Sequence, residues 1–339
     1  MYDLLVFIGR FQPLHLGHQK VIDHALSISK EVLVLIGSSN QARSTRNPLT
    51  YEERSNLITA IYPDVITRPL HDHTYNDTAW IVEVQKHVYD LLLDGAKWQP
   101  NGIKDFKIGL VGYEKDHSSY YLKMFPDWAN EDVKSNLIMD ATVLRNQMYE
   151  DKVPARWFQS VALNLKVYDW LHEFMQTEEF AKLKEEYNYL VEYKKTYGEG
   201  PFLTADALVQ VGGKILLINR GKEYGHGLLA MPGGFLNKNE RFQSAMVREL
   251  KEETNLRVPI PVINGSIISH RVFDDPHRSE RGRLITEAFH VKLVNDTKLP
   301  EVRGGDDADK ADWYDIGTLS RADFFEDHFH IIKAMLGVN

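Results

Sequence analysis

The stretch GFLNKNERFQSAMVRELKEETNL, residues 234–256, is the part of this 339-residue chain that best defines a fold and a chemistry. Residues three and four apart on an α-helix share a face, so Glu249, Glu252 and Glu253 point the same way, with Arg248 beside them. Three carboxylates on one face repel one another, and a divalent cation that also binds phosphate oxygens removes that repulsion. The stretch predicts a metal-dependent phosphate site, and the alternative is a solvated acidic helix face.

These offsets, preceded by Met231-Pro232-Gly233-Gly234, resemble the Nudix box, the metal-binding motif of hydrolases that cleave nucleoside diphosphates linked to another group. Asn255 stands where the family has Gly, but Asn is the best non-glycine residue at a left-handed helix end. The resemblance implies Mg²⁺, or Mn²⁺, as cofactor. Glu252 is then a ligand or the base that activates water, and Glu253 is both a ligand and a catalytic candidate. The metal ligands that it implies are Glu249, Glu252 and Glu253.

A second motif, GRFQPLHLGH at residues 9–18, lies between a predicted strand (residues 4–9) and a predicted helix (residues 17–30). The helix N-terminus carries a partial positive charge that suits a phosphate, and Gly17 permits close approach of the ligand. His15 and His18 can donate hydrogen bonds to phosphoryl oxygens as charge builds in the transition state. Positioning and charge stabilisation are sufficient for direct phosphoryl displacement. The alternative is a chance pair of histidines near a turn.

This second motif resembles the nucleotidyltransferase superfamily that contains His-x-Gly-His, and more narrowly the archaeal-type nicotinamide mononucleotide adenylyltransferases. The resemblance extends over about the first 190 residues. It includes the segments 46–54, 112–120 and 140–145. Asp140 stands where the superfamily has Ser, which removes one phosphate-facing hydroxyl.

The resemblance implies that ATP and nicotinamide mononucleotide react to give NAD and pyrophosphate. His15 and His18 then hold the ATP phosphates, and Arg46 and Arg145 clamp the β and γ phosphates with their forked guanidinium groups. Trp80 is the candidate to stack on the cationic nicotinamide ring, and its alternative role is a core position of a helix. The other substrate-binding candidates are Gly9, Arg10, Phe11, Asn47, Gly112, Lys115, Asp116 and Thr142.

Two turn-rich segments, 273–283 and 304–308, resemble those of the ADP-ribose-handling branch of the Nudix family. Arg278 and Arg283 are the substrate-binding candidates there, and the alternative is that both segments are ordinary exposed loops. Because the first half of the chain would make NAD, the fusion suggests that the second half hydrolyses ADP-ribose, a breakdown product of NAD, to AMP and ribose 5-phosphate. Two other interpretations stay open for the second half, a ligand sensor or a hydrolase of another nucleoside diphosphate derivative. For the first half, an alternative acceptor is pantetheine phosphate or another phosphorylated alcohol.

Composition limits the classes of function. The chain has no cysteine, which excludes disulfides, thiolate zinc sites and a cysteine nucleophile and suits a reducing cytosol. Its formal net charge of −8 argues against a general nucleic-acid binder. Residues 1–5 have no basic signal-peptide region, and no apolar run is long enough to span a bilayer. We therefore expect a cytoplasmic protein that binds neither nucleic acid nor membrane, and the sequence is compatible with a homo-oligomer.

The fold class expected is α/β, in two domains. Strands at 4–9, 32–37, 65–69 and 106–112 alternate with helices at 17–30, 50–61 and 78–93, which predicts a doubly wound, Rossmann-like parallel sheet with ligands at the carboxyl ends of its strands. This nucleotidyltransferase domain is expected at 1–190, with a helical connector over 156–197. An α+β Nudix domain is expected at 200–339. Its predicted strands are 204–211, 214–219, 260–273, 284–293 and 312–316, and its predicted helices are the box and 327–335.

Overall fold

The computed structural model describes residues 1–94, 106–112, 124–133, 140–151, 162–221, 224–294, 299–305 and 308–338. The contacts between residues divide the chain into an N-terminal unit, Met1–Lys184, and a C-terminal unit, Glu185–Asn339. Over the described part of the chain, no helix combines the length and the apolar character needed to cross a membrane.

Five parallel strands form the sheet of the N-terminal unit, in the order β3-β2-β1-β4-β5. The chain builds outward from β1 to β3 and then returns to the other side of β1 with β4. The strand order therefore reverses at β1, and in such sheets ligands bind beyond the carboxyl ends of the strands at this point. The strands are β1 Tyr2–Gly9, β2 Ser29–Ile36, β3 Ile66–Pro69, β4 Ile108–Gly112 and β5 Ala129–Asp132.

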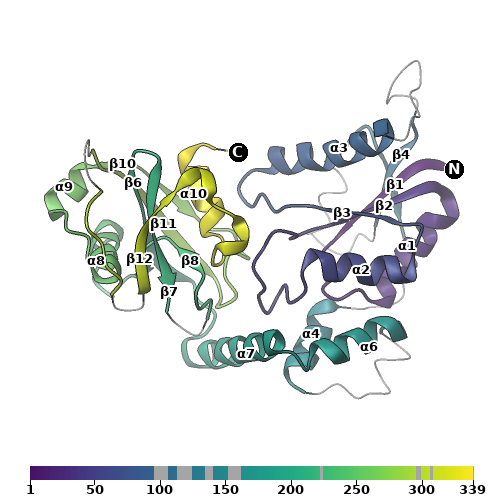
Figure 1. The fold of residues 1–339 in the computed structure, drawn as a ribbon, viewed down its shortest axis with the longest axis horizontal. Helices are drawn as coiled ribbons and strands as arrows, with labels where there is room; N and C mark the ends of the chain where they lie inside the picture. The colour runs from purple at the N-terminus through teal and green to yellow at the C-terminus, as the bar shows by residue number, and fades with distance from the viewer. Residues whose placement is uncertain are drawn as a thin grey trace. The chain divides into compact units, whose positions relative to one another are not determined.

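Helices cover both faces of this sheet, with α3 on one side and α1 and α2 on the other (Figure 1). Successive residues of a strand point to opposite faces, and Leu4 and Val6 of β1 pack in one apolar cluster with Val84 and Val88 of α3. The helices are α1 Leu16–Ile28, α2 Tyr51–Ile61, α3 Asp77–Asp94, α4 Ala141–Tyr149, α6 Leu165–Phe174 and α7 Glu178–Tyr197, which runs on into the C-terminal unit.

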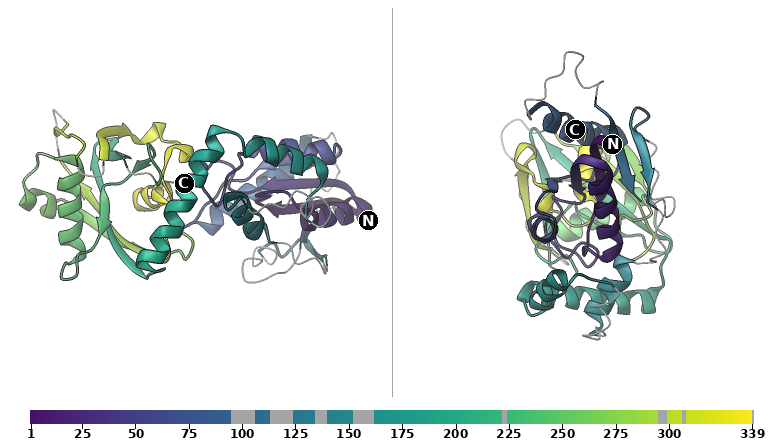
Figure 2. Two further views of the ribbon diagram at one scale, coloured as in Figure 1. Left: turned by 90° about the horizontal axis from the view of Figure 1, so that it is seen from below. Right: turned by 90° about the vertical axis from the view of Figure 1, so that its right-hand side faces the viewer.

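The C-terminal unit is built on a mixed sheet in the order β10-β11-β6-β7-β12, with β8 paired to β7 and β9 to β6. Helices α8 and α10 lie on opposite sides of this sheet (Figures 1 and 2). The strands are β6 Phe202–Val211, β7 Lys214–Arg220, β8 Leu229–Ala230, β9 Gly233–Phe235, β10 Ile267–Phe273, β11 Leu284–Lys292 and β12 Ala308–Asp315. The helices are α8 Phe242–Thr254, α9 Ile260–Gly265 and α10 His328–Leu336.

The doubly wound parallel sheet and the α+β second domain are confirmed. One predicted element is wrong: the strand expected over 260–273 is a short helix, α9, followed by β10. Pro261 explains the helix, because proline lacks an N–H and its fixed φ suits the first helical turn. The helical stretch expected over 156–197 contains two helices in its described part, α6 and α7, separated at residues 175–177.

Candidate functional site

His15 and His18 lie at the start of α1, directly beyond the carboxyl end of β1. The Nδ1 atom of His15 accepts a hydrogen bond from the backbone N–H of His18, and Nδ1 of His18 accepts one from the N–H of His15, both at 3.3 Å. The two rings stack with their centroids 3.7 Å apart. Because Nδ1 is an acceptor in both rings, the proton of each neutral imidazole is on Nε2. His15 and His18 therefore each present an Nε2–H donor, and their hydrogen bonds to the backbone hold the two rings in place.

Burial, together with the neighbouring His15, lowers the pKa of His18 well below its usual value of 6.5, so this ring is neutral at physiological pH. Phe11 supports it, because the Phe11 ring is buried and its centroid lies 4.8 Å from that of His18. A Cβ atom added at Gly9 would approach the Phe11 ring to 3.0 Å, so glycine permits this packing. Gly9 thus leaves room for the Phe11 ring, and Phe11 packs against the His18 ring.

Arg54 fixes the loops on which this edge of the sheet depends. Its buried guanidinium donates to the backbone carbonyls of Arg10 at 2.7 Å, Gly37 at 2.6 Å and Ser38 at 3.1 Å, and its Nε donates to that of Thr50 at 2.9 Å. Burial lowers the pKa of Arg54 to about 10, which leaves it charged at neutral pH. One side chain therefore joins the segments that follow β1 and β2.

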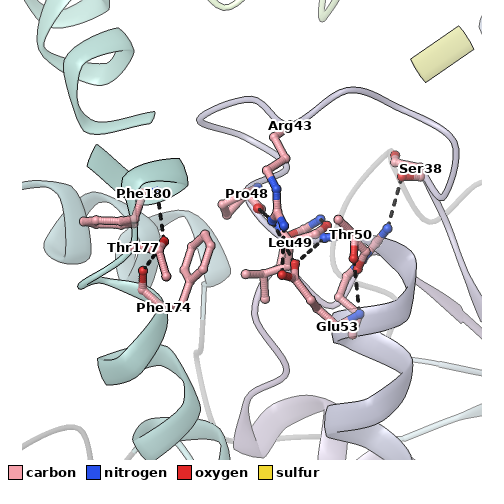
Figure 3. Close-up of polar contacts among 11 residues, drawn as sticks. Ser38, Arg43, Pro48, Leu49, Thr50, Glu53, Phe174, Thr177 and Phe180 are labelled. Carbon is pink, nitrogen blue, oxygen red and sulfur yellow. Dashed lines mark hydrogen bonds and ion pairs between the residues drawn. The ribbon is translucent and has the colours of Figure 1, made fainter. Parts of the chain in front are cut away.

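Arg43 and Glu53 restrain the loop between β2 and α2 (Figure 3). Two hydrogen bonds of 2.8 Å join the Arg43 guanidinium to the Glu53 carboxylate, and the guanidinium also lies 5.5 Å from the centre of the Phe174 ring. Thr50 and Glu53 form the capping box of α2. In the described structure the buried Oδ1 of Asn47, on the same loop, has no hydrogen-bond partner.

Arg145 and Thr142 belong to α4, and the structure brings them to the histidine segment. Arg145 is buried and donates to the Gln12 carbonyl at 2.7 Å and to Thr142 Oγ1 at 3.3 Å. The Asp140 carboxylate accepts from the Thr142 N–H at 2.8 Å and caps the helix. Ser and Asp are both favoured N-cap residues, which accounts for Asp at position 140. The Gln12 side chain is itself paired with the Leu49 backbone at 2.8 and 3.0 Å.

The remaining N-terminal candidates are more widely distributed. Arg46 is half-buried on the loop that carries Asn47, and Gly112 ends β4 at the ligand edge of the sheet. Trp80 is half-buried in α3, packs on the apolar cluster of the sheet and lies 6.1 Å from the Phe125 ring. Core packing of Trp80 is thus observed. Lys115 and Asp116 lie outside the described residues.

In the C-terminal unit, Arg248 of α8 joins three carboxylates. Its guanidinium donates to Glu240 at 2.8 and 2.9 Å, to Glu249 at 2.7 Å and to Glu252 at 3.0 Å. The hydrogen bond from Arg248 is the main cause that lowers the pKa of Glu240 to about 2. Asn255 ends the helix in the left-handed conformation, with φ 47° and ψ 29°, as the sequence predicts.

Glu253 has a different environment from its two neighbours, because it is buried and accepts a hydrogen bond from the Gly233 N–H at 2.9 Å. Burial, with a smaller contribution from the Glu249 carboxylate, raises the pKa of Glu253 to about 8 despite that hydrogen bond. A divalent cation would favour the ionised form, and carboxylate oxygens are the ligands that Mg²⁺ and Mn²⁺ prefer. Among the described residues no three acidic or histidine side chains are gathered closely enough to hold a metal ion, so the fit rests on the donor chemistry of Glu249, Glu252 and Glu253, which line one pocket.

A pocket of about 780 Å³ lies against this face of α8, within the size range of ligand pockets. Glu249, Glu252 and Glu253 all line it. On the other walls are aromatic side chains and arginines, namely Tyr189, Tyr193, Tyr197, Phe202, Phe235, Arg220, Arg248 and Arg281.

The two arginines expected to bind substrate, Arg278 and Arg283, do not line the described pocket beside α8. Arg278 is buried in an ion pair with Asp327, through two contacts of 2.9 Å, and lines a smaller neighbouring cavity. Arg283 lies 3.8 Å from Asp274 and does not line the pocket as described. Arg281 lines both the pocket and the neighbouring cavity. Arg281 lies in the segment 273–283, but the sequence does not single it out, because the spacing of three arginines does not tell which one faces inward.

Comparisons with known proteins find matches to both halves of the chain. Residues 6–88 match the Cytidylyltransferase-like family model, and residues 201–335 match the NUDIX domain model. A nicotinamide/nicotinic acid mononucleotide adenylyltransferase from Acinetobacter baylyi is 33% identical over 191 residues, which cover 55% of this chain and 94% of that protein. An ADP-ribose pyrophosphatase from Methanocaldococcus jannaschii is 35% identical over 133 residues, or 39% of this chain and 72% of that one.

A solved structure matches almost the whole chain. It is a bifunctional NMN adenylyltransferase/ADP-ribose pyrophosphatase from Francisella tularensis, complexed with AMP and a manganese ion. It is 33% identical, the match covers 99% of both chains, and the TM-score is 0.89. The same two kinds of domain are joined in that enzyme. The chain belongs to the family of bifunctional nicotinamide mononucleotide adenylyltransferases fused to a Nudix ADP-ribose pyrophosphatase.

Proposed function

We propose that the N-terminal unit transfers AMP from ATP to nicotinamide mononucleotide, giving NAD and pyrophosphate, and that the C-terminal unit hydrolyses ADP-ribose to AMP and ribose 5-phosphate. The observation that carries the proposal is the match to the Francisella tularensis enzyme over 99% of both chains. The geometry of the two sites supports it, since one offers hydrogen-bond donors at the switch point of a parallel sheet and the other a carboxylate-lined pocket.

In the adenylyl transfer, a phosphate oxygen of the mononucleotide attacks the α-phosphorus of ATP, and the bond from that phosphorus to the β-bridging oxygen breaks. Nε2–H of His15 and His18 would donate to the phosphoryl oxygens, where negative charge increases. Arg145, held by the Gln12 carbonyl, and Arg46 would bind the leaving pyrophosphate. The lowered pKa of His18 fits a hydrogen-bond donor that stays neutral, and not a general acid near neutral pH.

In the hydrolysis, Glu249, Glu252 and Glu253 would hold Mg²⁺ or Mn²⁺. When bound, the metal neutralises the diphosphate and lowers the pKa of coordinated water. Arg248 orients Glu249 and Glu252 through its hydrogen bonds, and Glu252, the exposed member of the three, is the candidate base. The Gly233 N–H donates to the Glu253 carboxylate and so fixes its orientation.

Product chromatography tests both halves of the proposal in one purified sample. ATP with nicotinamide mononucleotide and Mg²⁺ should give NAD and pyrophosphate, and ADP-ribose with Mg²⁺ or Mn²⁺ should give AMP and ribose 5-phosphate in equal amounts. Pantetheine phosphate in place of the mononucleotide is the control acceptor and should give no product. Binding of ADP-ribose without turnover would instead support a sensor, and turnover of other nucleoside diphosphate derivatives alone would change the substrate.

A further inference from the structure

One carboxylate and three histidines form a cluster beside the β3 edge of the N-terminal sheet. Glu83 of α3 contacts His71 and His73, which belong to residues 70–76, the segment that joins β3 to α3. The backbone N and Nδ1 of His71 lie 3.1 and 2.9 Å from Oε1 of Glu83, and Nε2 of His73 lies 2.7 Å from Oε2. Nε2 of His87, one turn further along α3, is 3.6 Å from Oε1. The mechanism proposed above uses none of these four side chains.

Glu83 is the acceptor at the centre of this cluster. Burial of its side chain favours the neutral carboxyl, but the hydrogen bonds from His71 and His73 outweigh burial and hold the pKa of Glu83 well below its usual value. The carboxylate is therefore ionised at physiological pH and can only accept, so Nδ1 of His71 and Nε2 of His73 carry protons. No three of these side chains are placed to hold a metal ion, as is true throughout the described residues. The cluster therefore acts through hydrogen bonds that join segment 70–76 to α3.

Segment 70–76 also contacts the loop between β2 and α2. The N–H and the Oγ of Ser39 donate to the Leu70 carbonyl at 3.2 and 2.9 Å, and the Gln41 side chain donates to the Asp72 carboxylate. Because β2 and β3 are parallel, both connections leave the sheet at its carboxyl edge, where ligands bind in doubly wound folds. The segment that Glu83 holds is therefore part of the ligand edge of the sheet.

The same segment leads directly to Trp80, the candidate to stack on the nicotinamide ring. The Asn76 N–H donates to the His73 carbonyl at 2.8 Å, and the Asn76 carbonyl accepts from the Trp80 N–H at 3.2 Å. Oδ1 of Asn76 accepts from the Ala79 N–H at 3.0 Å. Glu83 follows Trp80 by three residues, so the two side chains are neighbours on one side of α3. Hydrogen bonds thus connect Glu83, through His73 and Asn76, to the first turn of the helix that carries Trp80.

We propose that Glu83 is a positioning residue for adenylyl transfer, which holds segment 70–76 and Trp80 in the places where they bind the mononucleotide. The proposal rests on the function proposed above. Glu83 acts through His73 and Trp80 and does not itself contact the substrate. The ATP phosphates are assigned to the histidine pair after β1 and to two arginines on other segments. Loss of Glu83 should therefore weaken the binding of one substrate and not of the other.

Steady-state kinetics of adenylyl transfer by the full-length protein test this role. The KM for the mononucleotide, the KM for ATP and kcat are measured for the wild type, Glu83→Ala, Glu83→Gln and His73→Ala. Glu131→Ala is the matched control, because Glu131 of β5 also contacts a histidine, His24 at 3.2 Å, but at the opposite edge of the sheet. Glu83→Ala is also made together with Trp80→Ala, which shows whether its effect passes through the indole.

Glu83→Ala should raise the KM for the mononucleotide about tenfold and change the KM for ATP less than about twofold, because a misplacement of about 1 Å can cost as much as about 10²-fold. His73→Ala should act in the same direction. Glu83→Gln keeps an oxygen acceptor for the His71 N–H and should stay close to the wild type, as should Glu131→Ala. In the Trp80→Ala background the loss of Glu83 should add little, because effects that pass through one residue are not additive. Equal changes in both KM values, no change in either, or full additivity with Trp80→Ala would overturn the proposal.

Two further measurements keep the test decisive. If Glu83→Ala does not fold, His73→Ala decides by the same criteria, because it leaves the hydrogen bond between Glu83 and the His71 N–H in place. If the wild type forms no NAD, the proposed function fails, and the positioning role is tested by calorimetric titration with nicotinamide mononucleotide. Weaker binding by Glu83→Ala than by Glu131→Ala supports the role. Equal binding by these two variants, or no binding by the wild type, overturns it.

Discussion

The side chains assigned to phosphate are neutral or cationic in the N-terminal unit, whereas in the C-terminal unit they are carboxylates. His15 and His18 are positioned by reciprocal hydrogen bonds with their own backbone. Glu249 and Glu252 are instead positioned by one arginine, Arg248. Both units are proposed to act on phosphate anhydrides. The two sites therefore differ in the source of the positive charge that offsets the negative charge of the phosphates.

This difference has a physical consequence. A neutral imidazole can be buried at modest cost and can present its N–H without a counterion, so the histidine pair is organised before substrate arrives. Buried carboxylates oppose their own ionisation, as the raised pKa of Glu253 shows. Burial therefore opposes the ionised form of Glu253, which a bound cation would favour, whereas His18 is already neutral because its pKa is lowered.

The largest effect expected from this contrast is that of Glu253→Gln. The substitution keeps the shape of the side chain and removes a carboxylate of the metal set, so we expect hydrolysis of ADP-ribose to fall by about 10³-fold. Adenylyl transfer should not change. Steady-state rates of both reactions on one preparation give the measurement. A parallel loss of both activities would show that the two units depend on each other or that the variant does not fold.

His18→Ala is the complementary substitution in the N-terminal unit. Loss of one preorganised donor to the developing charge should lower the kcat of adenylyl transfer by about 10²–10³-fold, with hydrolysis unaffected. His24→Ala on the same helix is the matched control, because His24 faces Glu131 at 3.2 Å and not the histidine pair. Retention of full transferase activity in His18→Ala would remove the histidine pair from the mechanism.

These two substitutions concern residues that the sequence identifies from local spacing. The start of α1 at the end of β1, the capping box of Thr50 and the left-handed end at Asn255 all depend on neighbours within a few residues. The sequence therefore contains enough information to predict them. The prediction from local sequence is wrong at residues 260–265. An apolar run with β-branched residues favours a strand there, but the prolines at the start of the segment favour a helix.

Other parts of the sites depend on residues distant in the chain. Arg54 contacts carbonyls at positions 10, 37 and 38, and no spacing in the sequence specifies that convergence. The choice of Arg281 over Arg278 for the pocket depends on Asp327, nearly fifty residues later, which binds Arg278. Tyr193 had a local signal, three tyrosines four residues apart, but only the fold shows which unit that face meets.

Trp80→Ala tests which side chain binds the mononucleotide in the N-terminal unit. If the indole stacks on the nicotinamide ring, the KM for the mononucleotide should rise about tenfold, with less than about a twofold change for ATP. Trp128→Ala is the matched control, since Trp128 packs on the same apolar cluster and stacks on Phe125 at 4.5 Å. Equal changes for the two substrates in Trp80→Ala would assign the residue to core packing alone.

The smallest effect expected concerns stability and not catalysis. Burial raises the pKa of Glu186 from 4.5 to about 7, so the folded state holds this proton more tightly than the unfolded state does. The stability that Glu186 contributes should therefore be fully present below about pH 4.5 and be lost as the pH rises towards 7. Glu186→Gln keeps an acceptor for the Gly225 N–H and cannot ionise. The substitution should leave the free energy of unfolding nearly unchanged at pH 5 and raise it by about 1–2 kcal/mol at pH 8. This is less than the full pKa shift implies, because Glu186 is partly exposed.

Urea unfolding of the wild type and of Glu186→Gln at both pH values measures this change in the free energy of unfolding, with Glu185→Gln as the exposed control. A pH-independent effect would contradict the prediction, because it would mean that the Glu186 carboxyl is solvated in the folded state.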